Sequence, residues 1–136
     1  MKKKQFLVFI LSLLAVTTHA LAENLILDNQ TSYPIKNSQS QIAIQWASSA
    51  NEVQVDNDAL MNGNVDRSSK LHVLPQTGMN TIDIPENAEY FRVLVWSTAN
   101  EAPDLHTNWV DVTPKKVYTL KNDQLIPIAL MSGTGC

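Results

Sequence analysis

The chain has 136 residues and a formal net charge of −3, and 44% of its residues are hydrophobic. This length fits one compact domain. The acidic balance argues against nucleic acid as a partner, because an acidic surface repels phosphate backbones. The only cysteine is Cys136, which excludes a disulfide within the chain.

Residues 1–22 have the pattern of a signal peptide. Three lysines at positions 2–4 precede an apolar run over residues 6–16, and Ala20 and Ala22 are the small residues that a signal peptidase requires. The apolar run is shorter than the roughly 20 residues of a membrane-spanning helix. We therefore expect cleavage after Ala22 and export through the inner membrane of a bacterium, to the periplasm or the exterior. Cleavage leaves 114 residues, and loss of the three lysines changes the charge from −3 to −6.

Short runs with period-two alternation follow, separated by clusters of Asn, Asp, Ser, Gly and Pro, and this pattern is typical of strands. The expected strands are 25–28, 41–47, 52–55, 70–74, 81–84, 90–97, 109–112, 117–120 and 125–130. No segment has a sustained helical stripe, and residues 57–61 are interpreted as a turn. Pro75 and Gly78 predict a hairpin turn between the runs 70–74 and 81–84.

Several short strands without intervening helices favour antiparallel pairing. The sequence therefore predicts an all-β fold, a single antiparallel β-sandwich, Ig-like or jelly-roll-like, of about 7–9 short strands after the cleaved signal peptide. The expected organisation is a signal peptide (1–22), a sandwich domain (23–131) and a flexible tail (132–136). Pro127 removes a ladder donor and indicates that the last strand lies at an edge or a bulge.

Side chains alternate between the two faces of a strand, so the aromatic residues can be sorted by position. In 41–47 the core set contains Trp46, and in 90–97 it contains Phe91. The opposite face, if it points outward, is an amphipathic aromatic patch of the kind found at recognition surfaces. Its residues are Tyr90, Arg92, Trp96, Trp109 and Asp111. The competing interpretation is that the strand is buried on both sides and that Tyr90 and Trp96 are covered.

Two groups of residues suggest metal binding or catalysis less specifically. The oxygen-rich stretch Asp56, Asp58, Asn62, Asn64 and Asp66 has donors of the kind that calcium prefers, but its spacing differs from an EF-hand loop and favours a solvated loop. Glu101, Asp104 and His106, with the distant His72, are the candidates for a second metal site or for a small hydrolase. No nucleophile or zinc motif accompanies them.

Cys136 ends the chain after a Ser-Gly-Thr-Gly stretch. An odd cysteine in an exported protein predicts either an intermolecular disulfide or an unpaired thiol at a frayed terminus. The overall expectation is an exported binding protein without cofactor, whose ligand is a protein or a carbohydrate. The alternatives are an assembly subunit joined through an exposed strand edge or a Cys136-linked dimer, and a small secreted hydrolase.

Overall fold

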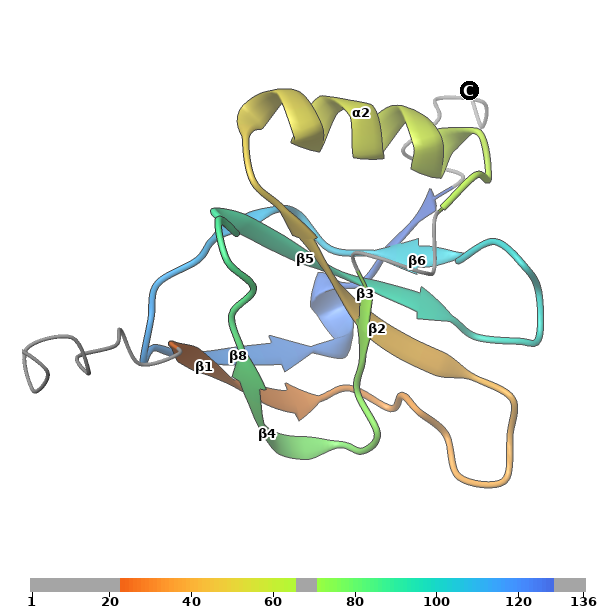
Figure 1. Cartoon of the computed structure of the whole chain (residues 1–136). Helices are drawn as coiled ribbons and strands as arrows, with labels where there is room; N and C mark the ends of the chain where they lie inside the picture. Colours follow the sequence, from red (N-terminus) through yellow and green to blue (C-terminus); the bar gives the residue numbers. More distant parts are fainter. Residues whose placement is uncertain (1–22, 66–70, 129–136) are drawn as a thin grey trace, which may run out of the picture.

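The computed structural model describes residues 23–65 and 71–128, which form two β-sheets and one α-helix (Figure 1). The strands and helices are β1 (Asn24–Gln30), β2 (Gln41–Ala47), α2 (Ala50–Met61), β3 (Leu71–Val73), β4 (Gly78–Asp83), β5 (Tyr90–Trp96), β6 (Leu105–His106), β7 (Val110–Asp111), β8 (Val117–Lys121), the 3-10 turn η2 (Asn122–Gln124) and β9 (Ile126–Pro127). The predicted predominance of β structure is confirmed. The predicted signal peptide, Asp66 and the tail with Cys136 lie outside the described residues.

The smaller sheet has the strand order β4-β1-β8. β1 pairs antiparallel with β4 but parallel with β8, so the prediction of purely antiparallel pairing is wrong. Parallel neighbours need a long connection. The chain has one here, because all strands of the other sheet except β9 come between β1 and β8.

The larger sheet has the order β3-β2-β5-β6-β9, and β7 also pairs with β5. All of these pairings are antiparallel. The predicted hairpin of 70–74 with 81–84 is wrong, because β3 pairs with β2 and β4 pairs with β1 in the other sheet. Leu74 is buried in the core between the two sheets, which draws the chain across from one sheet to the other.

One apolar cluster joins the two sheets in a sandwich-like arrangement. It contains Leu25, Leu27, Ile42, Ile44, Trp46, Leu74, Ile82, Phe91, Val93, Val95 and Leu120. The Phe91 ring lies between two others, 6.0 Å from the Trp46 ring and 4.9 Å from the Tyr118 ring, which it meets edge-on at 86°. The core faces that alternation predicted for β2 and β5 are therefore confirmed.

Helix α2 replaces the predicted strand 52–55 and the predicted turn 57–61. Ser49 caps its N-terminus: the Ser49 hydroxyl accepts from the Glu52 backbone N–H at 3.1 Å, and the Ser48 hydroxyl donates to the Glu52 carboxylate at 2.8 Å. Serine three residues before glutamate is a helix-start signal, which outweighs the short alternation of Val53 and Val55.

The helix lies on the side of the larger sheet that faces away from the smaller one (Figure 1). Leu60 of α2 packs there in a second apolar cluster with Ala43, Leu94 and Trp96. β2 and β5 are consequently buried on both faces. No helix in the described part of the chain has the length and apolar character to cross a lipid bilayer.

Candidate functional site

The aromatic patch expected on β5 is not exposed. Arg92 and Trp96 do point away from Phe91 as predicted, but they are only 1% and 2% exposed. Trp96 packs in the cluster with Leu60 and donates its indole N–H to the Glu101 carbonyl at 3.0 Å. The outward patch is therefore not formed, and the competing interpretation is confirmed for Arg92 and Trp96: β5 is buried on both sides, because α2 covers its outer face.

Arg92 and Trp109 belong to a polar network beneath α2. The guanidinium donates to Gln45 Oε1 at 2.7 Å, to Asn57 Oδ1 at 2.8 Å and to the Asp56 carbonyl at 3.1 Å. Its carbon lies 4.4 Å from the centre of the Trp109 ring, and the Trp109 indole N–H donates to the same Asn57 oxygen at 2.9 Å. The network attaches the helix to the sheet, so these side chains have a structural role.

Burial lowers the pKa of Arg92 to about 10, and the nearby charge of Asp56 partly opposes this effect. The guanidinium remains protonated at neutral pH. A buried cation keeps its charge only when hydrogen bonds and an opposite charge compensate for lost hydration. The three acceptors around Arg92 supply that compensation.

Tyr90 and Asp111, the other two predicted contact residues, lie opposite each other in the pairing of β5 with β7. They line a hollow of about 460 Å³ that Glu23 and Glu89 also border. The five predicted residues are thus divided among three places: the cluster with Leu60, the Arg92 network and this acidic hollow. They do not form one contact surface.

The proposed calcium loop is largely helical. Asp56 and Asp58 lie two residues apart on α2, so they are on different sides of the helix, and Asn62 and Asn64 follow its end. Asp56 is buried beside Arg92, whereas Asp58 is exposed and accepts from the Gln54 amide at 3.3 Å. Within residues 23–65 and 71–128, no three His, Cys, Asp or Glu side chains are arranged to hold a metal ion.

The residues proposed for a hydrolase site bond to different partners and do not bond to one another in the contacts below. The Asp104 carboxylate accepts from the Ser97 backbone N–H at 2.7 Å and also from the Ser97 hydroxyl. His106 is buried in β6, and its Nδ1 lies 3.0 Å from the Thr107 carbonyl oxygen, so this nitrogen is the protonated one. Burial lowers the His106 pKa, the bond to Thr107 opposes this, and the Arg92 charge lowers it further. His72 lies apart from them, on the exposed β3.

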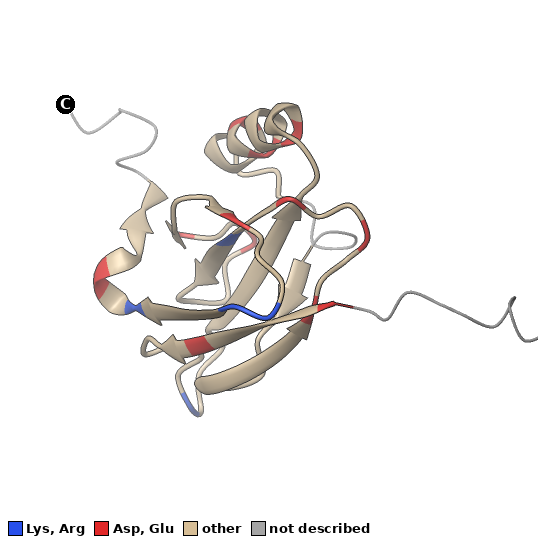
Figure 2. Cartoon of the chain, turned by 90° about the vertical axis from the view of Figure 1, so that its left-hand side faces the viewer, with Lys and Arg blue, Asp and Glu red and all other residues tan. Residues whose placement is uncertain are grey.

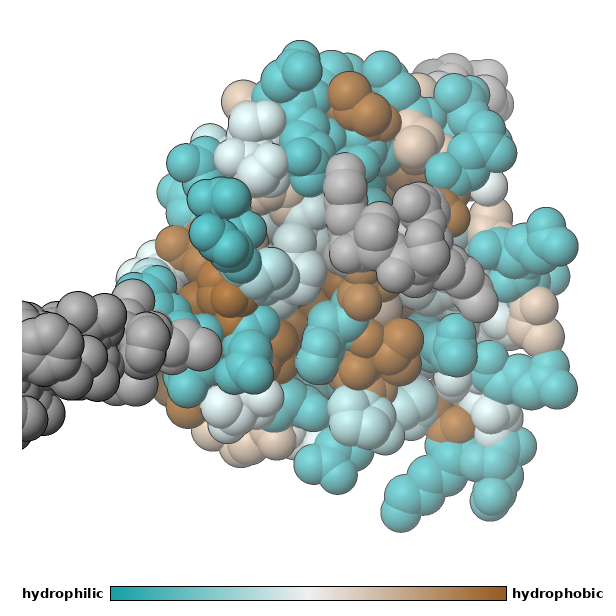
Figure 3. Space-filling model, in the orientation of Figure 1, coloured by the Kyte–Doolittle hydropathy of each residue, from teal (hydrophilic) through white to brown (hydrophobic). Residues whose placement is uncertain are grey.

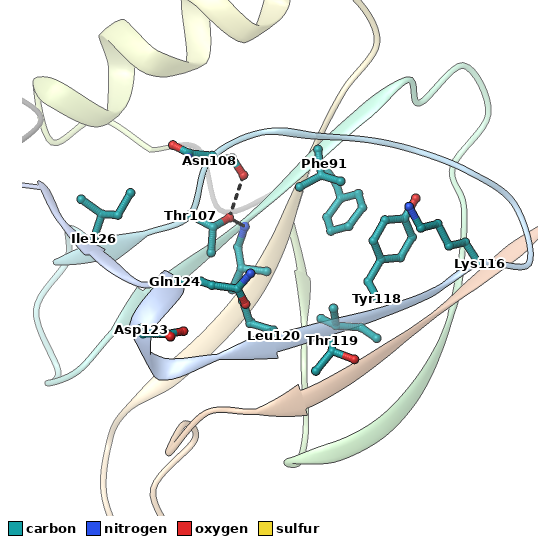
Figure 4. A pocket seen from close by; sticks show the side chains of 13 residues that line it. Phe91, Thr107, Asn108, Lys116, Tyr118, Thr119, Leu120, Asp123, Gln124 and Ile126 are labelled. Carbon is teal, nitrogen blue, oxygen red and sulfur yellow. Dashed lines mark hydrogen bonds between the residues drawn. The ribbon is translucent and has the colours of Figure 1, made fainter.

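A groove that the sequence analysis missed lies between the two sheets, beside β8. Its volume is about 490 Å³. One wall is β8 with Tyr118 and Leu120, and the opposite wall is the segment from Thr107 to Val110, which joins β6 to β7 (Figure 4). The floor includes Leu27 and Val93, which belong to the core. The groove therefore leads from the surface to the apolar interior.

The walls of the groove are held by local hydrogen bonds. Thr107 donates its backbone N–H to the Val93 carbonyl at 2.9 Å, and its hydroxyl accepts from the Val93 N–H at 2.9 Å. These bonds replace ladder pairing where β5 has neither β6 nor β7 beside it. On the other wall, the Tyr118 hydroxyl donates to the Asp111 carbonyl at 2.8 Å. The two walls are therefore fixed to the larger sheet.

The rim of the groove is polar and differs in charge between its two ends. Lys116 lies just before β8 and Asp123 lies in η2 just after it. Figure 2 shows blue where β8 begins and red in the helical turn that follows it, with further blue at the end of β8 itself. Lys121, the last residue of β8, does not line the groove. The Lys116 ammonium also lies 4.9 Å from the centre of the Tyr118 ring. Among the charged residues that line the groove, Lys116 is at one end of β8 and Asp123 is at the other.

Other exposed apolar side chains are scattered. Val73 and Met79 are 52% and 57% exposed, and Figure 3 shows hydrophobic side chains in several separate places on this face, among them the area over β3. Single exposed apolar residues are normal on a protein surface. The groove differs from them because it is concave and continuous with the core.

Sequence reasoning located β8 as the run 117–120 but had no means of showing that it is an edge strand, because strand order was unknown. The alternation of Tyr118 and Leu120 was the available signal, since it gives the strand one apolar face. No known family model matches this chain, and no curated protein sequence matches it either. The case for function therefore depends on the geometry of the site.

Proposed function

We propose that the protein is an exported binding protein that acts without a cofactor and holds a protein ligand in the groove beside β8. Export rests on the signal-peptide pattern of residues 1–22. Binding rests on one main observation, a groove of about 490 Å³ whose floor is the apolar core. Concave sites with an apolar floor and a few polar groups at the rim are the usual form of ligand sites.

The ring contacts favour a protein ligand over a carbohydrate. A sugar ring stacks on the free face of an aromatic side chain, together with planar polar groups. In the groove, the Phe91 and Tyr118 rings meet each other edge to face at 86°, and the Lys116 ammonium lies over the Tyr118 ring. Trp109 is stacked under Arg92. Apolar side chains of a protein need no free ring face and fit the floor directly.

An uncharged fluorescent probe, N-phenyl-1-naphthylamine, tests whether the groove admits apolar groups. We expect saturable binding to the purified protein that weakens at least about tenfold in Val110→Lys, because Val110 lines the groove and a charge there opposes burial of the probe. Val110 is 37% exposed, so the lysine can reach solvent without unfolding β7.

Val117→Lys is the matched control. Val117 is 51% exposed on β8 but does not line the groove, so this variant should bind the probe as the native protein does. Equal binding by the native protein and by Val110→Lys would show that the probe does not enter the groove. That result, or an absence of binding, would remove the basis of the proposed function.

The second candidate is an assembly subunit, which the open edge of β8 favours. An exposed strand edge can pair with another chain. Sedimentation with and without reductant distinguishes the two functions, because an assembly subunit forms concentration-dependent oligomers. A species that reductant converts to monomer would instead identify Cys136, the only cysteine, as the link.

A further inference from the structure

Among residues 23–65 and 71–128, β8 pairs only with β1, so it is an edge strand of the smaller sheet and half of its peptide groups face away from β1. The Ile26 N–H donates to the Lys116 carbonyl at 3.0 Å, and Ile26 lies opposite Val117. In a parallel ladder such a residue bonds to the two residues that flank its opposite number. The peptide groups of Val117 and Thr119 therefore point to the open side, where the groove lies.

An extended segment placed on this edge satisfies both features of the site. Its backbone pairs with the open peptide groups of β8, and its alternate side chains point into the groove over Leu27 and Val93. β8 is five residues long. At about 3.3 Å per residue it offers roughly 16 Å of edge, which suits a peptide strand better than a compact small molecule.

The charges at the two ends of β8 select one direction for the added strand. In an antiparallel arrangement the carboxyl end of the peptide lies near Lys116 and its amino end lies near Asp123. Opposite charges then meet at both groove-lining positions, whereas a parallel strand places like charges together there; Lys121, which ends β8, does not line the groove. The lysine pair 115–116 is the only place in this acidic protein where two basic residues adjoin after the signal peptide.

We propose that the groove takes an extended peptide segment of a partner protein, which adds antiparallel to β8. Alternate apolar side chains of the segment fill the groove, a basic group or free amino end lies near Asp123, and an acidic group or free carboxylate lies near Lys116. This assignment deepens the proposed function and rests on it.

The test selects random displayed peptides of about eight residues on the native protein. We expect the selected peptides to alternate apolar and polar residues, with basic residues at the amino end and acidic residues at the carboxyl end. Thr119→Pro should weaken their binding at least about tenfold, because proline removes the N–H that faces the peptide. N-methylation along one selected peptide should weaken binding at alternate positions only, and this readout needs no protein variant.

Thr81→Pro is the matched control on β4, the opposite edge of the same sheet. Both threonines are exposed. Because the Ile84 N–H donates to the Glu23 carbonyl at 2.8 Å, alternation directs the Thr81 N–H away from β1 as well. Thr81→Pro should leave the affinity for the peptide unchanged. It measures the effect of a proline on an edge strand that does not bind the peptide.

The outcomes separate this assignment from the proposed function. If Val110→Lys abolishes binding but neither Thr119→Pro nor N-methylation matters, the groove binds ligands without strand addition and the assignment is wrong. If neither the probe nor any peptide responds to Val110→Lys, the proposed function fails with it. A native dimer that Thr119→Pro dissociates would identify a second copy as the occupant and would overturn the peptide assignment.

Discussion

The two faces of β5 are both buried, yet they are buried in different ways. The inner face carries Phe91, Val93 and Val95, which pack against the smaller sheet. The outer face carries Arg92, Leu94 and Trp96, which pack beneath α2. The comparison shows that a mixed polar and aromatic face is no sign of exposure when a helix can supply its partners.

The contacts on the two faces also differ in direction. Apolar packing on the inner face is stabilising but not directional. On the outer face the guanidinium of Arg92 bonds to β2 through Gln45 and to α2 through Asn57, so it sets where the helix lies. Three predictions test this difference.

Loss of Arg92 should have the largest effect. Arg92→Leu leaves Gln45, Asn57 and the Asp56 charge without the cation, and we expect a loss of about 3–5 kcal/mol in the free energy of unfolding. Ile44→Val, a truncation on the inner face of the neighbouring strand, should cost only about 0.5–1.5 kcal/mol. Urea unfolding measures both.

A double variant tests whether the acceptors left without Arg92 cause the loss of stability. Arg92→Leu with Gln45→Leu removes one stranded acceptor along with the donor, so it should be more stable than Arg92→Leu alone. An Arg92→Leu variant as stable as native protein would show that the network does not hold the outer face.

Loss of the helix cap should have an intermediate effect. Ser49→Ala removes the acceptor for the Glu52 N–H, and we expect a loss of about 1 kcal/mol in unfolding free energy. Ser38→Ala is the comparison: it also removes a hydrogen-bonded serine hydroxyl, but in a turn away from α2, so it should not loosen the helix. Hydrogen exchange should locate the loosening in α2, and protection lost equally in β8 would contradict this localisation.

The smallest expected effect is on how the free energy of unfolding depends on pH. It comes from His106, which lies opposite Leu94 of the outer face of β5. Because burial lowers its pKa in the folded state, the unfolded chain binds the proton more readily. His106 therefore contributes its full stabilisation above the ordinary pKa of 6.5, and this contribution is lost as the pH falls from there toward the lowered pKa. His106→Gln should flatten this part of the curve of unfolding free energy against pH. An unchanged curve would show that His106 does not contribute.

Alternation located β2, β5 and their core faces correctly because that pattern depends only on neighbouring residues. The same reasoning produced a strand at 52–55, where two valines alternate, although Ser49 and Glu52 already carried a helix-start signal. For the candidate site, the sequence located the strand with Tyr118 and Leu120 but not the groove. A groove arises from the order of strands in two sheets, which pairs residues far apart in the chain.

By itself the sequence determined that the protein is mostly β, which side chains share a strand face, and that the chain opens with the pattern of an export signal. These depend on local spacing and side-chain type. Only the tertiary structure decided that α2 covers the outer face of β5, that β8 runs parallel to β1, and that no second strand of the described residues pairs with β8 beside the groove. Each of these depends on which distant segments meet, because burial is a property of the assembled layers and not of a strand alone.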